Sequence, residues 1–255
     1  MKKLLSYTCL AVLGMTSLNV SAAIVLDRTR VVYPGGAKSI SLNIKNENQK
    51  LPYLAQAWIE DAQGQKIASP FVVLPPVQRV DANQKSIVRI ASVPAIDSLP
   101  KDRESIYYFN LREIPPKSEK SNVMQIAVQS KIKLFYRPEA ILPERGAIWQ
   151  DQVLITKQGK ALKVNNPTPY YITYVGLGHP QGKGRTAIKG FSAFMVAPKS
   201  EQTVTIPETL GNEFVISYVN DYGGYMDIKY QCTGNACKAI KSDATLCIVS
   251  LSVPG

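Results

Sequence analysis

Short runs in which apolar and polar residues alternate recur along the chain and predict β-strands. Residues 39–44 read Ser-Ile-Ser-Leu-Asn-Ile, and the other runs are equally rich in β-branched or aromatic residues. Clusters of Pro, Gly, Asn and Asp separate the runs, and no stretch sustains a helical period of 3.6 residues. The predicted strands are 39–44, 53–59, 86–91, 106–111, 123–136, 152–156, 161–164, 170–175, 202–206, 214–219 and 226–231. The pattern is typical of all-β sandwich proteins.

A proline-containing seam at residues 137–143 divides these strands into two groups. Pro138 and Pro143 restrict the backbone there and end the strand before them. We therefore expect one β-sandwich over residues 23–142 and a second over 143–240, followed by a tail of unknown structure at 241–255. A single large barrel is the alternative.

The first 22 residues have the pattern of a secretion signal. Lys2 and Lys3 precede a mostly apolar stretch, and Val20-Ser21-Ala22 then places small residues before Ala23, as at a signal-peptidase site. No later segment approaches the roughly 20 apolar residues of a membrane span. We expect a cleaved, exported protein without membrane insertion; an uncleaved N-terminal anchor is the alternative.

Composition and motifs favour a binding protein over an enzyme. The chain has one His, His179, in what reads as a polar surface loop, and lacks a phosphate-binding glycine loop and a Gly-x-Ser-x-Gly elbow. We therefore predict no enzyme activity, no metal and no cofactor. The 30 Lys and Arg against 19 Asp and Glu give a net charge of +11, but these residues are spread along the chain. Export and this spread argue against nucleic acid, leaving a solvated basic surface or an acidic partner.

The Cys residues that follow the signal would lie in an oxidising compartment. Cys232 and Cys237 flank the turn-like sequence Thr-Gly-Asn-Ala, so a disulfide there would staple a hairpin. A metal site is the competing interpretation, although it lacks His and a second Cys pair. Cys247 is left over, as a free thiol or an intermolecular partner.

The predicted strand 123–136 has one apolar row, formed by Met124, Ile126 and Val128. Such a row on an edge strand would aggregate, or would add a strand to a partner protein. An ordinary core strand is the alternative interpretation.

At the level of motifs the chain resembles the periplasmic pilus-assembly chaperones. The resemblance runs through nearly the whole chain after the signal, to about residue 240, and rests on eight ordered segments. They are LDRTRVVYPGG (26–36), LPYLAQAWIE (51–60), PPVQR (75–79), LPKDRES (99–105), FNLREIPPKSEK (109–120), KIKLFYRP (131–138), NPTPYY (166–171) and NDYGG (220–224).

This resemblance implies two immunoglobulin-like domains in an L or boomerang arrangement with a cleft between them. A chaperone of the family binds one pilin subunit by donor-strand complementation, caps its groove and passes it to an outer-membrane usher. The lent strand matches Met124, Ile126 and Val128, and the pair that holds the subunit's terminal carboxylate matches Arg30 and Lys133. Lys131 would lie on the same face of the strand as Lys133 and is a weaker candidate for the carboxylate anchor.

The resemblance also implies an ionic network of Glu104, Arg137 and Asp221 at the domain seam, and it matches the Cys232–Cys237 pair. Because Lys133 is out of phase with Met124, either strong twist or a bulge near residues 129–131 is expected.

The short loop before this strand resembles that of the chaperones that serve rod-like pili with adhesive tips. Self-association of the free form stays open, as do two rival functions: a structural pilin or adhesin, and a secreted Ig-like enzyme or carbohydrate-binding module.

Overall fold

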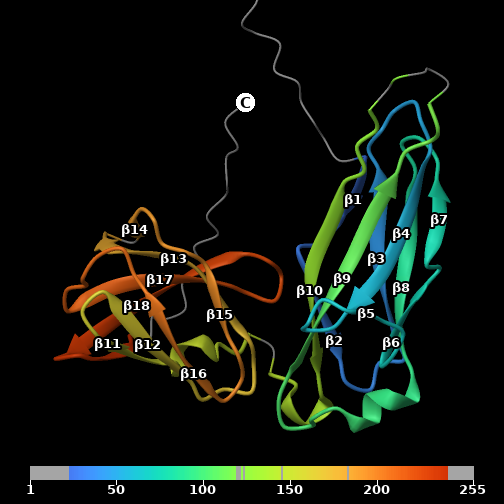
Figure 1. Cartoon of the computed structure of the whole chain (residues 1–255). Coiled ribbons are helices and arrows are strands. Elements are labelled where there is room, and N and C mark those ends of the chain that lie inside the picture. Colours follow the sequence, from blue (N-terminus) through green and yellow to red (C-terminus); the bar gives the residue numbers. More distant parts are fainter. Residues whose placement is uncertain (1–22, 119–121, 123, 145, 183, 241–255) are drawn as a thin grey trace, which may run out of the picture.

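The computed structural model describes residues 23–240, apart from 119–121, 123, 145 and 183. The predicted signal, the tail at 241–255 and Cys247 lie outside the described residues. Two β-sandwiches stand at an angle to each other, so that the molecule has the shape of an L (Figure 1). None of the helices in the described part is long and apolar enough to cross a membrane.

The first sandwich has two sheets that enclose a single apolar core. One sheet has the strand order β1 (Ile24–Leu26), β3 (Ser39–Asn46), β8 (Lys85–Ser92) and β6 (Phe71–Leu74). The other has the order β2 (Arg30–Pro34), β10 (Gln129–Arg137), β9 (Ser105–Ile114), β4 (Tyr53–Glu60) and β5 (Lys66–Ile67), with β7 (Val77–Val80) also paired to β4. The first segment therefore contributes β1 to one sheet and β2 to the other.

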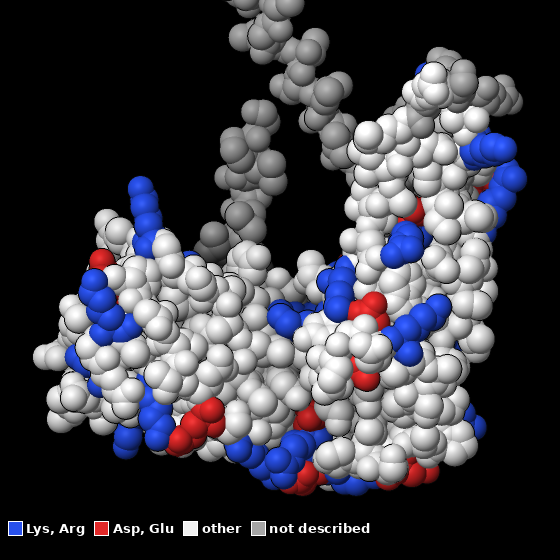
Figure 2. All heavy atoms as spheres, in the orientation of Figure 1, with Lys and Arg blue, Asp and Glu red and all other residues white. Residues whose placement is uncertain are grey.

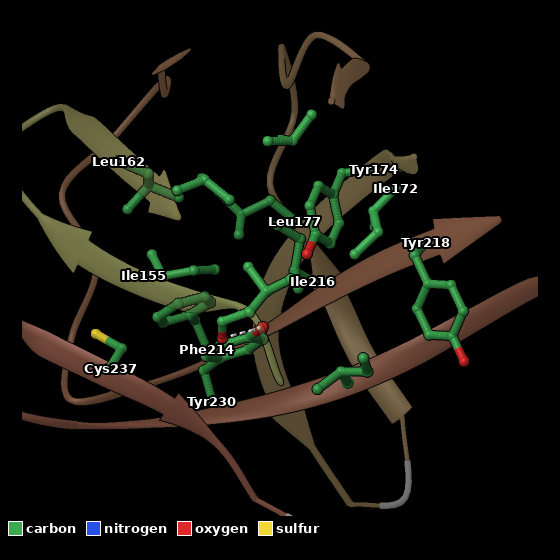
Figure 3. Packing of buried hydrophobic residues seen from close by; sticks show 14 of the residues in the cluster. Ile155, Leu162, Ile172, Tyr174, Leu177, Phe214, Ile216, Tyr218, Tyr230 and Cys237 are labelled. Atoms are coloured by element: carbon green, nitrogen blue, oxygen red, sulfur yellow. Dashed lines mark hydrogen bonds between the residues drawn. The ribbon is translucent and has the colours of Figure 1, made fainter. Parts of the chain in front are cut away.

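The second sandwich is built from one continuous hydrogen-bonded sheet that folds over on itself. Its strand order is β14 (Gly184–Ala187), β13 (Ile172–Gln181), β17 (Glu213–Val219), β18 (Tyr225–Thr233), β19 (Ala236–Ala239), β11 (Leu154–Lys157), β12 (Ala161–Asn166) and β16 (Ser200–Thr205), and β15 (Phe194–Val196) pairs with β13. Side chains from β11, β12, β13 and β17 meet in its core (Figure 3).

Three short 3₁₀ turns complete the described part: η1 (Pro94–Ser98), η2 (Glu139–Ile141) and η3 (Gln150–Gln152). The turn η2 lies in the linker between the sandwiches, against Gly35 at the end of β2. The Gly35 amide donates to the Arg137 carbonyl at 2.6 Å, and a Cβ at this position would collide with the Glu139 backbone. The Pro-Gly-Gly turn thus lets the first domain pack directly on the linker.

The all-β prediction with two sandwiches is confirmed, but two local predictions are wrong. Strand β10 begins at Gln129 rather than at residue 123. His179 lies near the end of β13 instead of in a loop, where it is exposed and contacts Glu208 at 2.6 Å. Cys232 and Cys237 form a disulfide across the β18–β19 hairpin.

Replacing Cys232 and Cys237 with alanine is expected to lower the free energy of unfolding of the second domain by about 2 kcal/mol, because the cross-link limits the unfolded chain. Hydrogen exchange in urea separates the two domains and measures this loss. The first domain should keep its stability, and a reducing agent should have no effect on the double variant. An equal loss in both domains would contradict this account.

Candidate functional site: a basic cleft beside a half-paired strand

Arg137, at the end of β10, lies at the junction of the two sandwiches and is 4% exposed. Its Nε donates to Glu104 Oε1 at 2.8 Å, and its Nη1 and Nη2 donate to the two carboxylate oxygens of Asp221 at 2.6 and 3.0 Å. The guanidinium also lies over Trp149 and Tyr170, 5.1 and 5.0 Å from the ring centroids. The structure therefore brings together the three residues for which the resemblance implies an ionic network.

Further contacts, which the sequence analysis did not predict, fix the same junction. The Glu104 Oε2 accepts the Tyr171 amide at 2.7 Å, and the Glu104 amide donates to the Pro169 carbonyl at 2.9 Å. Lys199 of the second domain reaches Asp102 of the first at 2.6 Å. Tyr171 lies in the segment NPTPYY (166–171), but its backbone contact with Glu104 depends on how the two domains dock, and no residue pattern predicts that contact.

Burial raises the pKa of Glu104 to about 7, against the opposing pull of the Arg137 guanidinium and the Tyr171 amide. The Asp221 carboxylate raises this pKa further. Glu104 is thus the member of the network whose charge changes near neutral pH.

Arg30 and Lys133 lie side by side, because β2 and β10 pair in parallel with these two residues in register. Arg30 Nη1 donates to the Val219 carbonyl of the second domain at 3.2 Å, while its Nε is buried without a hydrogen-bond partner. Within the described residues neither cation forms an ion pair. Lys and Arg side chains gather where the first domain faces the second (Figure 2).

Burial lowers the pKa of both Arg30 and Lys133, and for Lys133 the neighbouring Arg30 charge lowers it further. Two adjacent, half-buried cations repel each other and have lost part of their hydration. An anion placed between them would relieve both penalties, and a carboxylate would accept charge-assisted hydrogen bonds from each.

Lys131, the rival for the anchor, is already engaged. Its Nζ lies 2.6 Å from Glu60 Oε2 and 4.7 Å from the centroid of the Tyr108 ring. The Glu60 carboxylate is held in turn by the Trp58 indole N–H at 2.8 Å. Lys131 therefore carries a neutralised charge, whereas Lys133 does not.

The pairing of β10 with β9 runs from Gln129 to Tyr136 without a shift, so the bulge considered near residues 129–131 is absent. Leu134 faces the core of the first domain, and Lys133 points the other way, toward the cleft. If residues 124–128 continued β10 as a strand, the same alternation would place Met124 and Ile126 on the face opposite Lys133.

Met124, Ile126 and Val128 precede β10 and are not in a strand. Met124 is 87% exposed and Ile126 is 66% exposed. The opposing residues explain this: Pro115, two residues after Glu113, occupies the next position that would donate to this segment, and it has no N–H to continue the ladder. The Val128 carbonyl still accepts the Glu113 amide at 3.0 Å.

The edge of β10 that faces away from β9 is paired with another strand along only part of its length. Strand β2 pairs with it from Lys133 to Arg137, and no described strand pairs with Gln129–Ile132 on that side. Because the Glu113 amide bonds to Val128, alternation along the ladder points the N–H and C=O groups of Gln129 and Lys131 away from β9. These groups form an open edge directly above the two cations.

Comparison with known proteins identifies the family. Residues 23–142 match the family model "Pili and flagellar-assembly chaperone, PapD N-terminal domain", and residues 148–230 match "Pili assembly chaperone PapD, C-terminal domain". The chain is 50% identical to the chaperone protein PapD of Escherichia coli over 222 residues, which cover 86% of this chain and 91% of PapD. It is 46% identical to the chaperone protein PmfD of Proteus mirabilis (strain HI4320), over 92% of this chain and 94% of PmfD.

Solved structures give the same answer. The crystal structure of the periplasmic chaperone SfaE has 32% identity and a TM-score of 0.64, and covers 81% of this chain and 98% of its own. The Salmonella enterica SafA pilin in complex with the SafB chaperone has 27% identity and a TM-score of 0.70, and covers 84% of this chain and 98% of the matched one. The chain belongs to the PapD family of pilus-assembly chaperones.

The raised pKa of Glu104 gives a prediction for stability. Between its ordinary value of 4.5 and about 7, the folded chain keeps a proton on Glu104 that the unfolded chain releases. This group should therefore lower the free energy of unfolding as the pH rises through that window, by up to about 3 kcal/mol, with no further change above it.

Urea unfolding from pH 4.5 to 8 tests this prediction. Stability should fall less steeply with pH in Glu104→Gln than in the native chain, whereas Glu213→Gln, at an exposed position, should follow the native slope. Parallel curves for Glu104→Gln and the native chain would show that Glu104 is ionised throughout.

Proposed function

We propose that this chain is a chaperone that binds pilin subunits one to one, lends each the edge of β10, and passes them to an outer-membrane usher. Donor-strand complementation completes the incomplete sandwich of the subunit and caps its groove. The observation that carries the proposal is the edge of β10 that no described strand covers, beside Arg30 and Lys133, which form no ion pair with any described residue. A strand added to that edge would gain main-chain hydrogen bonds, and its terminal carboxylate would reach the cations.

Two roles follow for the segment around β10. Met124, Ile126 and Val128 would become ordered as a strand and fill pockets of the subunit. The exposure of Met124 and Ile126 in the free chain supports this role, because exposed apolar side chains gain most from being covered. Arg30 and Lys133 would bind the terminal carboxylate and so set the register of the added strand.

The domain seam would hold the cleft at a fixed angle. We assign the first domain to residues 23–142 and the second to 143–240, with the network of Glu104, Arg137 and Asp221 between them. We further propose that the chain reaches the periplasm through a cleavable signal at residues 1–22. The periplasmic relative SfaE and the sequence pattern around Ala22 support this.

Removing either anchor cation should weaken subunit binding by roughly tenfold or more, because a charge-assisted hydrogen bond in a half-buried cleft is lost. Denatured pilin is diluted into increasing concentrations of the native chain, Arg30→Ala, Lys133→Ala or the matched control Lys131→Ala. The amount of complex at each concentration is then measured by size-exclusion chromatography. The control should bind as the native chain does. A pilin with an amidated C-terminus should bind weakly and show no further loss with Lys133→Ala. Equal losses for Lys131→Ala and Lys133→Ala would contradict the anchor assignment.

A charge in the apolar row should block complementation. Ile126→Asp is expected to reduce complex formation by roughly a hundredfold, because the carboxylate would be buried in the subunit. Ala127→Asp, on the opposite face of the same segment, should cost no more than a few-fold. Both positions are exposed in the free chain, so its own unfolding curve serves as the folding control. Comparable losses at the two positions would show that the segment does not enter the subunit as an alternating strand.

A further inference from the structure

Glu113 is a carboxylate on the inner face of β9, two residues after the core residue Leu111, and it is 5% exposed. Its Oε2 accepts the Ile24 amide at 2.8 Å. No Lys, Arg or His among the described residues forms an ion pair with it. Lys45, which pairs with Val25 of β1, has its own partner in Glu47 at 3.0 Å. A buried carboxylate without a cation is costly, so this position calls for a positive charge.

Ala23 and Ile24 are held firmly beside that carboxylate. Ile24, in β1, pairs with Asn46 of β3, and the Ala23 carbonyl accepts a hydrogen bond from the Glu47 amide at 2.6 Å. Standard bond lengths place the Ala23 nitrogen at most about 3.7 Å from the Ile24 nitrogen, and hence within about 6.5 Å of Glu113 Oε2. In an uncut chain this nitrogen is a neutral amide.

We infer that the signal is removed between Ala22 and Ala23, and that the α-ammonium created there is the ionic partner of Glu113. A signal peptidase would add one water across the Ala22–Ala23 bond, so that Ala22 leaves with a carboxylate and Ala23 keeps an amine. Near pH 7 a free α-amine is mostly protonated. The inference rests on the export that forms part of the proposed function.

This pairing links processing to the subunit-binding edge. The Glu113 amide bonds to the Val128 carbonyl, immediately before β10. The mature N-terminus would therefore stabilise the end of β9 that bonds to Val128, the last residue of the apolar row. A chain that still carries its signal lacks this charge, so its first domain would be less stable.

A double-mutant cycle on chains of defined terminus tests the pair without export or pilin. The chain that begins at Ala23 is prepared with a free or an acetylated α-amine, each with and without Glu113→Gln, and unfolded in urea at pH 7. Acetylation should raise the unfolding equilibrium constant about tenfold or more in the native background and less than about threefold with Glu113→Gln. With Glu47→Gln as the matched control, the full effect should persist. Equal effects in the native and Glu113→Gln backgrounds would overturn the pairing.

A second measurement needs no variant, in case Glu113→Gln fails to fold. Reductive methylation of the Ala23 amine should be at least about tenfold slower in the folded chain than in the urea-unfolded chain, and equal rates would overturn the pairing. The mass of the chain recovered from the periplasm tests the cut separately. A terminus other than Ala23 would overturn the assigned processing site, whereas retention of the protein in the cytoplasm would count against the export on which the inference rests.

Discussion

Strand β10 is paired with a neighbouring strand along nearly its whole length on one side and along only part of its length on the other. Strand β9 covers residues Gln129 to Tyr136, whereas β2 covers Lys133 to Arg137. An uncovered strand edge exposes backbone donors and acceptors that bind other strands, and soluble proteins generally protect such edges. Here the edge lies beside two cations that have no acidic partner among the described residues. Both features are unfavourable in a free protein. One bound chain end would pair the exposed main-chain groups with a strand and the two cations with a carboxylate.

The order of residues along this strand couples binding to architecture. The exposed apolar row comes first, Lys133 faces the cleft, and Arg137 ends the strand inside the domain junction. A buried ion pair adds little net stability, but its geometry is directional. With Glu104 and Asp221 on either side of one guanidinium, and the Gly35 turn packed on the linker, the junction has little freedom to change angle. The second domain thereby forms a fixed wall of the cleft, and its Val219 carbonyl helps to orient Arg30.

Period-2 patterning predicted the long strands and the all-β class, because each buried strand alternates between core and solvent. It missed short strands such as β5 and β7, which contain too few residues to show a period. It also extended β10 over residues 123–128. Alternation predicts which face a side chain would take, but not whether the neighbouring strand can supply hydrogen bonds. Pro115 removes the next N–H that β9 would have donated to this segment. The network around Arg137 was accessible through motif resemblance. The Tyr171 amide that bonds to Glu104, and the separate Lys199–Asp102 pair, depend on how the domains dock.

A subunit that adds a strand to the open edge of β10 would cover the main-chain groups there. Amide hydrogen exchange of the chain, alone and with a bound pilin subunit, measures this cover residue by residue. We expect the amides of Gln129 and Lys131 to exchange rapidly in the free chain and to become strongly protected in the complex, while those of Ser130 and Ile132, which face β9, change little. Unchanged exchange at Gln129 and Lys131 in a fully formed complex would contradict this expectation, because the subunit would then be bound at another surface.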